Sequence, residues 1–140
     1  NLTHALAAAQ ADGLTLTLEP LNRADMAGYL YHLPSQVIAI LREFDSPHLR
    51  LQFDYYHCAK EGLDLSAELA QARDWIGHVQ IGGAPERFEP ELSQGGLLQA
   101  VRELPATGYH SWLGCEYRPR GVPAEGLNWC APLRAEGMLR

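Results

Sequence analysis

The chain has 140 residues, 46% of them apolar and 20% charged, and a formal net charge of −6 at neutral pH. This length and composition are those of one globular domain and exclude a disordered chain. The negative charge argues against nucleic-acid and anionic-membrane partners, and no run of 18 apolar residues is present to span a membrane.

Helical and strand patterns alternate along the first part of the chain. Apolar residues at helical spacing predict a helix over residues 2–11, and the alternation in LTLTL predicts a strand over Leu14–Leu18. A polar loop over residues 21–34 follows this strand. It leads to a helix that Ser35 would cap and that ends at Phe44.

The same strand and helix unit then repeats. Leu49–Phe53 predicts the second strand, with a loop after it, and Leu65–Arg73 predicts the next helix. Trp75–Ile81 predicts the third strand, followed by a loop rich in glycine and proline. The remaining elements are a helix, a fourth strand and a final helical turn, over Gly96–Leu104, Ser111–Cys115 and Pro132–Glu136.

The order of these elements predicts an α/β fold of the (β/α)₈ TIM-barrel type. Strands alternate with helices throughout, and the loops after strands are longer than the loops after helices. A complete barrel needs about 250 residues. The chain is therefore expected to hold about half of a barrel, as a fragment that begins inside a helix, and the absence of Met at Asn1 agrees with this expectation.

A side chain with a hard oxygen donor stands at or near the C-terminal end of each predicted strand. These side chains are Glu19, Asp54, Gln80 and Glu116. Active sites of barrels lie at this end of the strands, so we expect the four to converge. Three carboxylates in one cleft require a cation or raised pKa values, and this donor set suits Mg²⁺ or Mn²⁺ better than zinc. The alternative is a set of ordinary polar strand ends in contact with water.

Two further residues are candidates for binding a substrate. His57 follows Asp54 by three residues and could hydrogen-bond a substrate oxygen or shuttle a proton, or could be a surface loop histidine. Arg87 could bind a substrate carboxylate, or could pair with an acidic residue of its own loop. The acidic residues of that loop are Glu86, Glu89 and Glu91. His78 shares the face of Gln80 one layer deeper and is expected to be packed.

The cysteine pattern offers no alternative chemistry. Cys58, Cys115 and Cys130 are odd in number and lack CxxC spacing, which excludes a disulfide framework and a structural zinc site. No nucleophile elbow supports a serine hydrolase. The beginning of the chain lacks the pattern of a signal peptide, so we expect a cytoplasmic protein.

Four segments carry a resemblance to a known family. They are LTLEPLNRADMAGY, LRLQFDYYHC, IGHVQIGGAPERFEP and WLGCEYRPRG. Together they resemble the hydroxypyruvate isomerase family of xylose isomerase-like TIM-barrel enzymes, from about residue 10 to Trp129. The resemblance implies that residues 1–140 form a single domain, the C-terminal half of such a barrel, with about its last four βα units.

The resemblance also implies roles for the candidate residues. The positions that hold the divalent metal, Mg²⁺ or Mn²⁺, are matched by Glu19, Asp54, Gln80 and Glu116. The resemblance further implies that Glu19 and Glu116 are the catalytic proton donor and acceptor. His57 and Arg87 match positions that contact substrate oxygens in related enzymes. Gln80 stands where ketose epimerases of the superfamily place His, which favours the hydroxypyruvate or 2-oxo-tetronate isomerase branch.

The expected function is that of a metal-dependent isomerase of a small α-hydroxycarbonyl substrate. It would interconvert an α-hydroxy ketone and an aldehyde through a cis-enediolate, most simply hydroxypyruvate and tartronate semialdehyde. The alternatives within the superfamily are a 2-oxo-tetronate isomerase, a sugar epimerase and a phosphodiesterase, for which the net charge supplies no basic groove. An alternative of another class is a catalytically silent half-barrel that serves as an assembly piece. Its two open sheet edges would favour a homo-oligomer.

Overall fold

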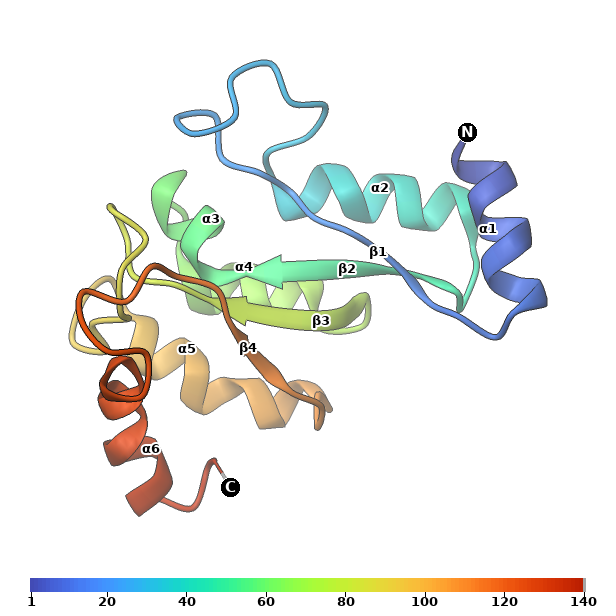
Figure 1. Ribbon diagram of the computed structural model, residues 1–140. Helices are drawn as coiled ribbons and strands as arrows, with labels where there is room; N and C mark the ends of the chain where they lie inside the picture. The colour runs from blue at the N-terminus through green and yellow to red at the C-terminus, as the bar shows by residue number, and fades with distance from the viewer. Residues whose placement is uncertain (140) are drawn as a thin grey trace.

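A computed structural model describes residues 1–139, and within them the chain forms one parallel sheet (Figure 1). Its strands lie side by side in chain order and are β1 (Leu16–Leu18), β2 (Leu49–Asp54), β3 (Ile76–Ile81) and β4 (Leu113–Cys115). Parallel neighbours joined through helices are the repeat of a TIM barrel, and four such strands are half of its eight. The expected fold class is confirmed.

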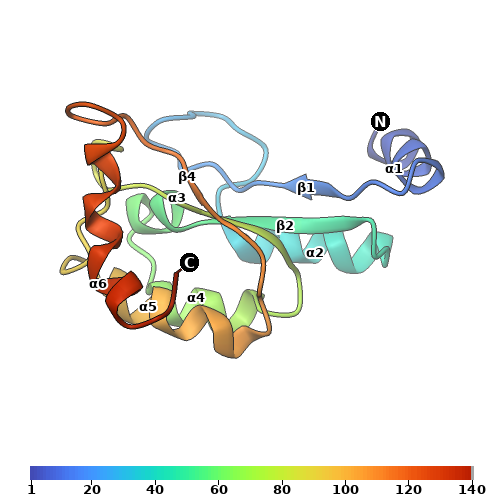
Figure 2. The same cartoon turned by 60° about the horizontal axis from the view of Figure 1, so that its bottom comes forward.

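Three of the helices cover one face of this sheet. The α-helices are α1 (Leu2–Ala11), α2 (Pro34–Phe44), α3 (Tyr55–Lys60), α4 (Leu65–Ala72), α5 (Leu97–Glu103) and α6 (Ala131–Ala135), and two 3₁₀ helices are η1 (Leu104–Thr107) and η2 (Glu125–Cys130). Figure 2 shows α2, α4 and α5 on the same side of the strands. Among the residues that the structure describes, no helix is long and apolar enough to cross a membrane.

Alternation along β2 separates an apolar face from a polar one. Leu49, Leu51 and Phe53 are buried beneath the helices in the hydrophobic core. The residues between them point to the opposite face because successive side chains of a strand alternate. There Gln52 accepts a hydrogen bond from Thr17 of β1 (3.1 Å) and donates one to Gln80 of β3. The polar face is therefore held together across three strands.

Two details of the expected helices are wrong. The segment after β2, expected as a loop, forms α3, because the Asp54 side chain accepts the Tyr56 N–H and caps the helix (2.8 Å). Ser35 does not cap α2. That helix begins one residue earlier with a proline, and Gln36 accepts the N–H of Leu33 (3.0 Å).

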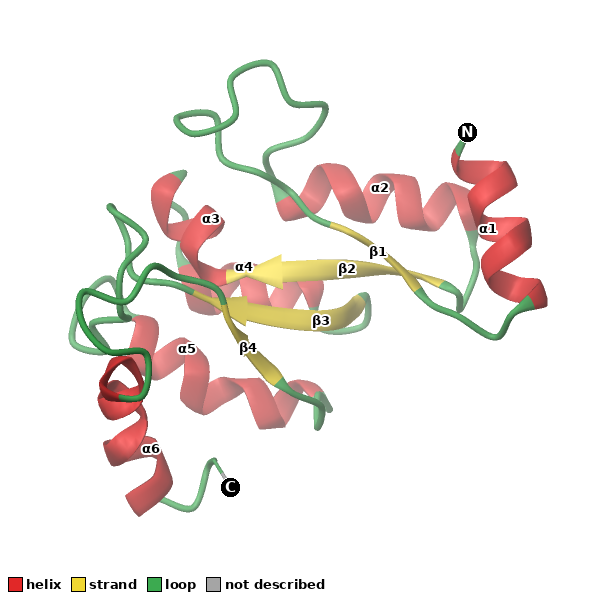
Figure 3. Cartoon of the chain, in the orientation of Figure 1, coloured by secondary structure: helices red, strands yellow, loops and turns green. Residues whose placement is uncertain are grey.

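The remaining differences concern the bounds of elements. β1 and β4 each begin two residues later than expected, and the last α-helix, α6, is preceded by the unexpected 3₁₀ helix η2. The long connections that follow the strands gather at one end of the sheet, as Figure 3 shows. This end carries the candidate site.

Candidate metal and substrate site

The four strand-end residues share one face of the sheet. The register pairs Asp54 of β2 with Gln80 of β3, and Glu116 donates its backbone N–H to Ile81 (3.0 Å). Leu18 packs against the core, so Glu19, the next residue, lies on the opposite face. Gln80 donates a hydrogen bond to the Glu116 carboxylate across the two strands (2.6 Å). The structure therefore brings together the strand-end side chains that were expected to converge at one end of the sheet.

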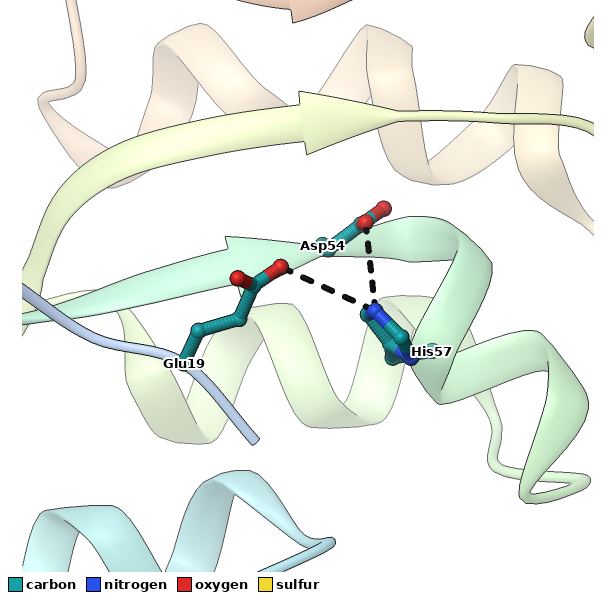
Figure 4. Close-up of side chains that lie close together, drawn as sticks. All are labelled: Glu19, Asp54 and His57. Atoms are coloured by element: carbon teal, nitrogen blue, oxygen red, sulfur yellow. Dashed lines mark ion pairs between the residues drawn. The ribbon is translucent and has the colours of Figure 1, made fainter. Parts of the chain in front are cut away.

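Glu19, Asp54 and His57 form the tightest part of this group. His57 Nε2 lies 3.7 Å from Glu19 Oε1 and 3.8 Å from Asp54 Oδ2 (Figure 4). One side-chain atom of each residue lies within 4.8 Å of the others. His57 belongs to α3 rather than to a loop, so the helix that Asp54 caps also places the imidazole over the site. The sequence placed this histidine in the right region but on the wrong kind of element.

Arg87 joins the fourth strand end to this cluster. Its Nη2 lies 2.9 Å from Glu116 Oε1 and 3.3 Å from Asp54 Oδ2, and its guanidinium stacks over the Tyr56 ring at 4.7 Å. The backbone of Arg87 is left-handed, with φ of 60°. Its ion-pair partners are thus residues of the site and not the acidic residues of its own loop, which were the alternative.

Burial shifts the ionisation of the cluster. Burial raises the pKa of Asp54 to about 7, against the opposing effects of the Tyr56 N–H and of Arg87. Burial also raises the pKa of Glu19 above its ordinary value. For His57, burial and then the charge of Arg87 lower the pKa to about 4. His57 is therefore neutral at neutral pH, which favours the expected role of a hydrogen bond to a substrate oxygen.

The donor atoms present fit a hard divalent cation. Glu19 Oε1 is buried and has no hydrogen-bond partner, and the side chain of Asp54 is fully buried. Buried charges are stable when they are paired or bind a metal ion, and carboxylate and amide oxygens are the donors that Mg²⁺ and Mn²⁺ prefer. The fit extends to Gln80 and Glu116, which lie on the same face and contact each other.

A cavity of about 330 Å³ opens beside the carboxylates. Its lining consists of Asp25, Tyr56, Arg87, Glu116, Tyr117 and Arg118. Gly82 allows the surrounding loops to approach, since a Cβ atom there would lie 2.8 Å from the carbonyl oxygen of Glu116. The volume falls at the lower end of the range of small-molecule pockets. Two guanidinium groups next to carboxylates suit a small ligand that carries a negative charge.

Three further residues lie at the site, and of these only Asn22 has no role predicted from the sequence. Asn22 is fully buried and contacts His57, while Tyr56 and Arg118 line the cavity. The only signal for Asn22 was a polar residue in the loop after the first strand, which is common to many loops. His78 is half-buried, with Nε2 close to Gly114, as the expectation of a packed histidine requires.

Comparison with known proteins gives a family and named relatives. The model of the family described as xylose isomerase-like TIM barrel matches residues 1–133. A 2-oxo-tetronate isomerase of Cupriavidus necator is 39% identical over 132 residues, which cover 94% of this chain and 51% of the relative. The hydroxypyruvate isomerase of Escherichia coli is 29% identical over 134 residues, which cover 96% of this chain and 52% of that protein.

Solved structures agree with the fold. The structure titled AP endonuclease, family 2, from Brucella melitensis has a TM-score of 0.78 and 32% identity, and the match covers 91% of this chain and 50% of that one. A 3-keto-D-glucoside 4-epimerase of E. coli has a TM-score of 0.78 and 27% identity, over 96% and 51% of the two chains. The chain spans about half the length of the curated relatives it matches.

Proposed function

The chain belongs to the xylose isomerase-like TIM-barrel family, and from this premise we propose that its strand ends form the metal and proton-transfer site of an isomerase. The reaction is the interconversion of an α-hydroxy ketone and an aldehyde, with hydroxypyruvate and tartronate semialdehyde as the substrate pair. The observation that carries the proposal is the buried carboxylate group at the ends of β1 and β2, with Glu19 Oε1 left without a partner.

Four residues would hold a divalent cation, Mg²⁺ or Mn²⁺. They are Glu19, Asp54, Gln80 and Glu116. When bound, the cation supplies Lewis-acid polarisation of the substrate carbonyl. Arg87 contacts two of these carboxylates through Nη2 and balances part of their charge.

Glu19 and Glu116 are the residues that move protons in this proposal. They follow β1 and β4, the first and last strands of the sheet, and therefore approach the site from its two sides. One glutamate removes the proton from the carbon that bears the hydroxyl, which leaves a cis-enediolate. The hydroxyl proton passes to the neighbouring oxygen of the enediolate, and the other glutamate delivers a proton to the adjacent carbon, so the reaction is balanced without a further reactant. The raised pKa of Glu19 brings this carboxyl closer to the pH at which proton transfer is efficient.

The substrate carboxylate is assigned to the cavity. Arg87 and Arg118 both line it and supply guanidinium groups that suit a carboxylate. His57 is assigned to a hydrogen bond with a substrate oxygen, because it is neutral and its Nε2 faces the space between Glu19 and Asp54.

A second candidate is a 2-oxo-tetronate isomerase, which the 39% identity to the enzyme of that name favours. A sugar epimerase is the third, favoured by the structural likeness to the epimerase. Product analysis separates them, since an epimerase inverts a stereocentre and leaves the ketone in place. A nuclease is disfavoured by the net charge of −6, which supplies no basic groove.

A calorimetric titration of the 140-residue chain with Mn²⁺ tests the proposal. We expect one site per chain, lost in Glu116→Gln and retained in Glu43→Gln, an exposed glutamate of α2. The chain that binds Mn²⁺ is then assayed for conversion of hydroxypyruvate. Absence of Mn²⁺ binding, or equal binding by Glu116→Gln, would refute the assignment of the metal to these strand ends and favour the silent assembly piece.

A further inference from the structure

Asn22 makes a buried contact with the imidazole of His57. It lies in the loop after β1, is fully buried, and donates its backbone N–H to His57 Nδ1 (3.0 Å). Its side-chain Nδ2 lies 2.8 Å from the same ring nitrogen. Two groups of one residue thus meet a single atom of His57.

The orientation of the Asn22 amide is fixed by Asp25. Asn22 Oδ1 accepts the backbone N–H of Asp25, and Asn22 Nδ2 donates to Asp25 Oδ2, both at 2.9 Å. A backbone N–H can only donate and a carboxylate can only accept, so rotation of the amide by half a turn would break both hydrogen bonds. The NH₂ group therefore faces His57.

Asp25 is itself held in place from α3. Tyr56 donates its hydroxyl to Asp25 Oδ2 (2.5 Å), and Lys60 Nζ lies 3.6 Å from Asp25 Oδ1. The loop after β1 and the helix after β2 are joined through this carboxylate. The amide of Asn22 accordingly has a rigid support on the same helix that carries His57.

Two donors at Nδ1 determine where the imidazole carries its hydrogen. A nitrogen that accepts hydrogen bonds cannot be protonated, and a neutral imidazole has one protonated nitrogen. The hydrogen is therefore on Nε2, the atom that faces Glu19 and Asp54 at 3.7 and 3.8 Å. These distances are too long for hydrogen bonds, so Nε2 is a buried donor with no partner among the described residues.

We propose that Asn22 is a positioning residue that fixes the Nε2–H tautomer of His57. His57 then presents a hydrogen-bond donor to the space between Glu19 and Asp54 and has no lone pair there for a metal ion. Nε2 lies close enough to both carboxylates to share a metal ion with them. With its hydrogen on Nε2, however, His57 cannot be a ligand, and the metal site is left with oxygen donors alone. The use of the N–H toward a substrate oxygen rests on the proposed function, whereas the tautomer itself does not.

Nitrogen NMR of the ¹⁵N-labelled chain tests the tautomer without turnover, because protonated and unprotonated ring nitrogens have well-separated shifts. The His57 signals are assigned by their loss in His57→Gln. At pH 7.5 we expect a protonated Nε2 and an unprotonated Nδ1. A protonated Nδ1 in the unaltered chain would overturn the proposal, whatever the chain's activity.

Asn22→Asp tests whether the amide of Asn22 determines the tautomer of His57. The substitution places an acceptor beside Nδ1 that competes with the backbone N–H, so we expect a larger share of the Nδ1–H tautomer. We also expect a gain in Zn²⁺ affinity relative to Mn²⁺ of about tenfold or more, since imidazole nitrogen is a good zinc ligand. Asn128→Asp, the same change at an exposed residue, should alter neither quantity. If Asn22 had a purely structural role, Asn22→Asp would lower the affinities for Zn²⁺ and Mn²⁺ by the same factor.

A second variant keeps the test decisive if Asn22→Asp fails to fold. Asn22→Ala removes one of the two donors and keeps the backbone N–H at Nδ1. The Nε2–H tautomer should therefore remain the major form, with a larger minor share of Nδ1–H that moves the averaged Nδ1 shift part of the way toward the protonated value. An Nδ1 shift unchanged from the unaltered chain would show that the amide does not hold the tautomer, and the proposal would fall.

Discussion

The two carboxylate oxygens of Asp54 have different partners. Oδ1 accepts the Tyr56 N–H and caps α3, while Oδ2 faces His57 and Arg87. The cap fixes the rotation of the carboxylate, so the second oxygen points into the site with little freedom to turn away. A single residue therefore couples the helix that carries His57 to the oxygen donors of the proposed metal site.

The pKa of about 7 for Asp54 predicts how divalent binding depends on pH. A ligand carboxylate must be deprotonated, so a proton competes with the cation at every pH below this pKa. The apparent Kd for Mn²⁺ should be constant above pH 7 and rise about tenfold per unit below it, to about pH 5.5. His57, with a pKa of about 4, stays neutral over this range and adds no slope.

Calorimetry between pH 5.5 and 8.5 checks this dependence. Repeating each titration in buffers of different ionisation enthalpy counts the protons released, and below pH 7 the count should approach one per cation. A constant affinity over the whole range would contradict the raised pKa. Circular dichroism at each pH serves as the control for folding.

Arg118 and Arg120 are a matched pair of residues with which the proposed binding of a substrate carboxylate can be tested. Both guanidinium groups stack on Phe88, at 5.5 and 4.6 Å, but Arg118 lines the cavity whereas Arg120 pairs with Glu89. Loss of a hydrogen bond between charged groups costs about 1.5–3 kcal/mol. Arg118→Gln should therefore weaken binding of hydroxypyruvate by about ten- to a hundredfold.

The selectivity of the Arg118 effect is measured with dihydroxyacetone, which has a CH₂OH group in place of the carboxylate. Its affinity should not change in Arg118→Gln, and Arg120→Gln should leave the affinities for both compounds unchanged. An equal loss for the acid and the neutral compound would indicate a distorted cavity in place of a lost carboxylate contact.

At the scale of single residues, the sequence predicts the positions of some site residues well and those of others not at all. Glu19, Asp54, Gln80 and Glu116 could be placed together because strand alternation and parallel pairing bring strand ends to one edge. Asn22 could not be found in this way. Its contact with His57 joins residues 35 positions apart and depends on how a loop folds back over a helix.

At the scale of elements, the close approach of two loops depends on Gly82. A Cβ atom there would lie 2.8 Å from the carbonyl oxygen of Glu116, so the loop after β4 would have to move. Gly82→Ala should lower the free energy of unfolding by about 1–3 kcal/mol, as overpacking does, and should weaken Mn²⁺ binding because Glu116 moves with its backbone.

Urea unfolding and Mn²⁺ calorimetry measure the two effects of Gly82→Ala. Gly121→Ala is the matched control, because the nearest atom to its Cβ is 3.8 Å away, in ordinary contact. Equal stability and metal affinity for Gly82→Ala and the unaltered chain would show that the two loops can separate without disturbing the site.

The helices show where element prediction succeeds and fails. α2 and α4 have apolar faces that recur at helical spacing, and their sequence signal is clear. α3 is only six residues long and begins with two tyrosines, so it has no amphipathic period to detect. It forms because Asp54 caps it and because Tyr55 is buried in the core, where its hydroxyl donates to the carbonyl oxygen of Ala100 (3.0 Å).

At the scale of the whole molecule, the described residues form half of a closed architecture. Helices α2, α4 and α5 lie on one face of the sheet (Figure 2), and the alternation along the strands directs the polar side chains of the site to the other face. The sequence predicts this architecture through the spacing of its βα units. The register of β2 and β3, which shifts between Leu51 and Gln52, could not be predicted, because it depends on packing between strands.

The outer edges of β1 and β4 have no strand partner within residues 1–139, and Trp112, just before β4, is 84% exposed. Open strand edges favour pairing with another chain, and two copies would supply the eight strands of a barrel. We therefore predict that the 15.5-kDa chain sediments as a dimer at micromolar concentration.

Sedimentation equilibrium of two matched variants tests this arrangement. Trp112→Lys places a charge beside the β4 edge and should weaken the dimer, whereas Leu30→Lys, at a residue 81% exposed in the loop after β1, should not. Neither side chain is packed in the core, so the fold should survive both changes. If the unaltered chain is a monomer and still binds one Mn²⁺, the prediction is contradicted. The four strands would then hold the metal site without a second copy. A dimer that retains Mn²⁺ while Trp112→Lys loses both properties would show that closure of the sheet supports the site.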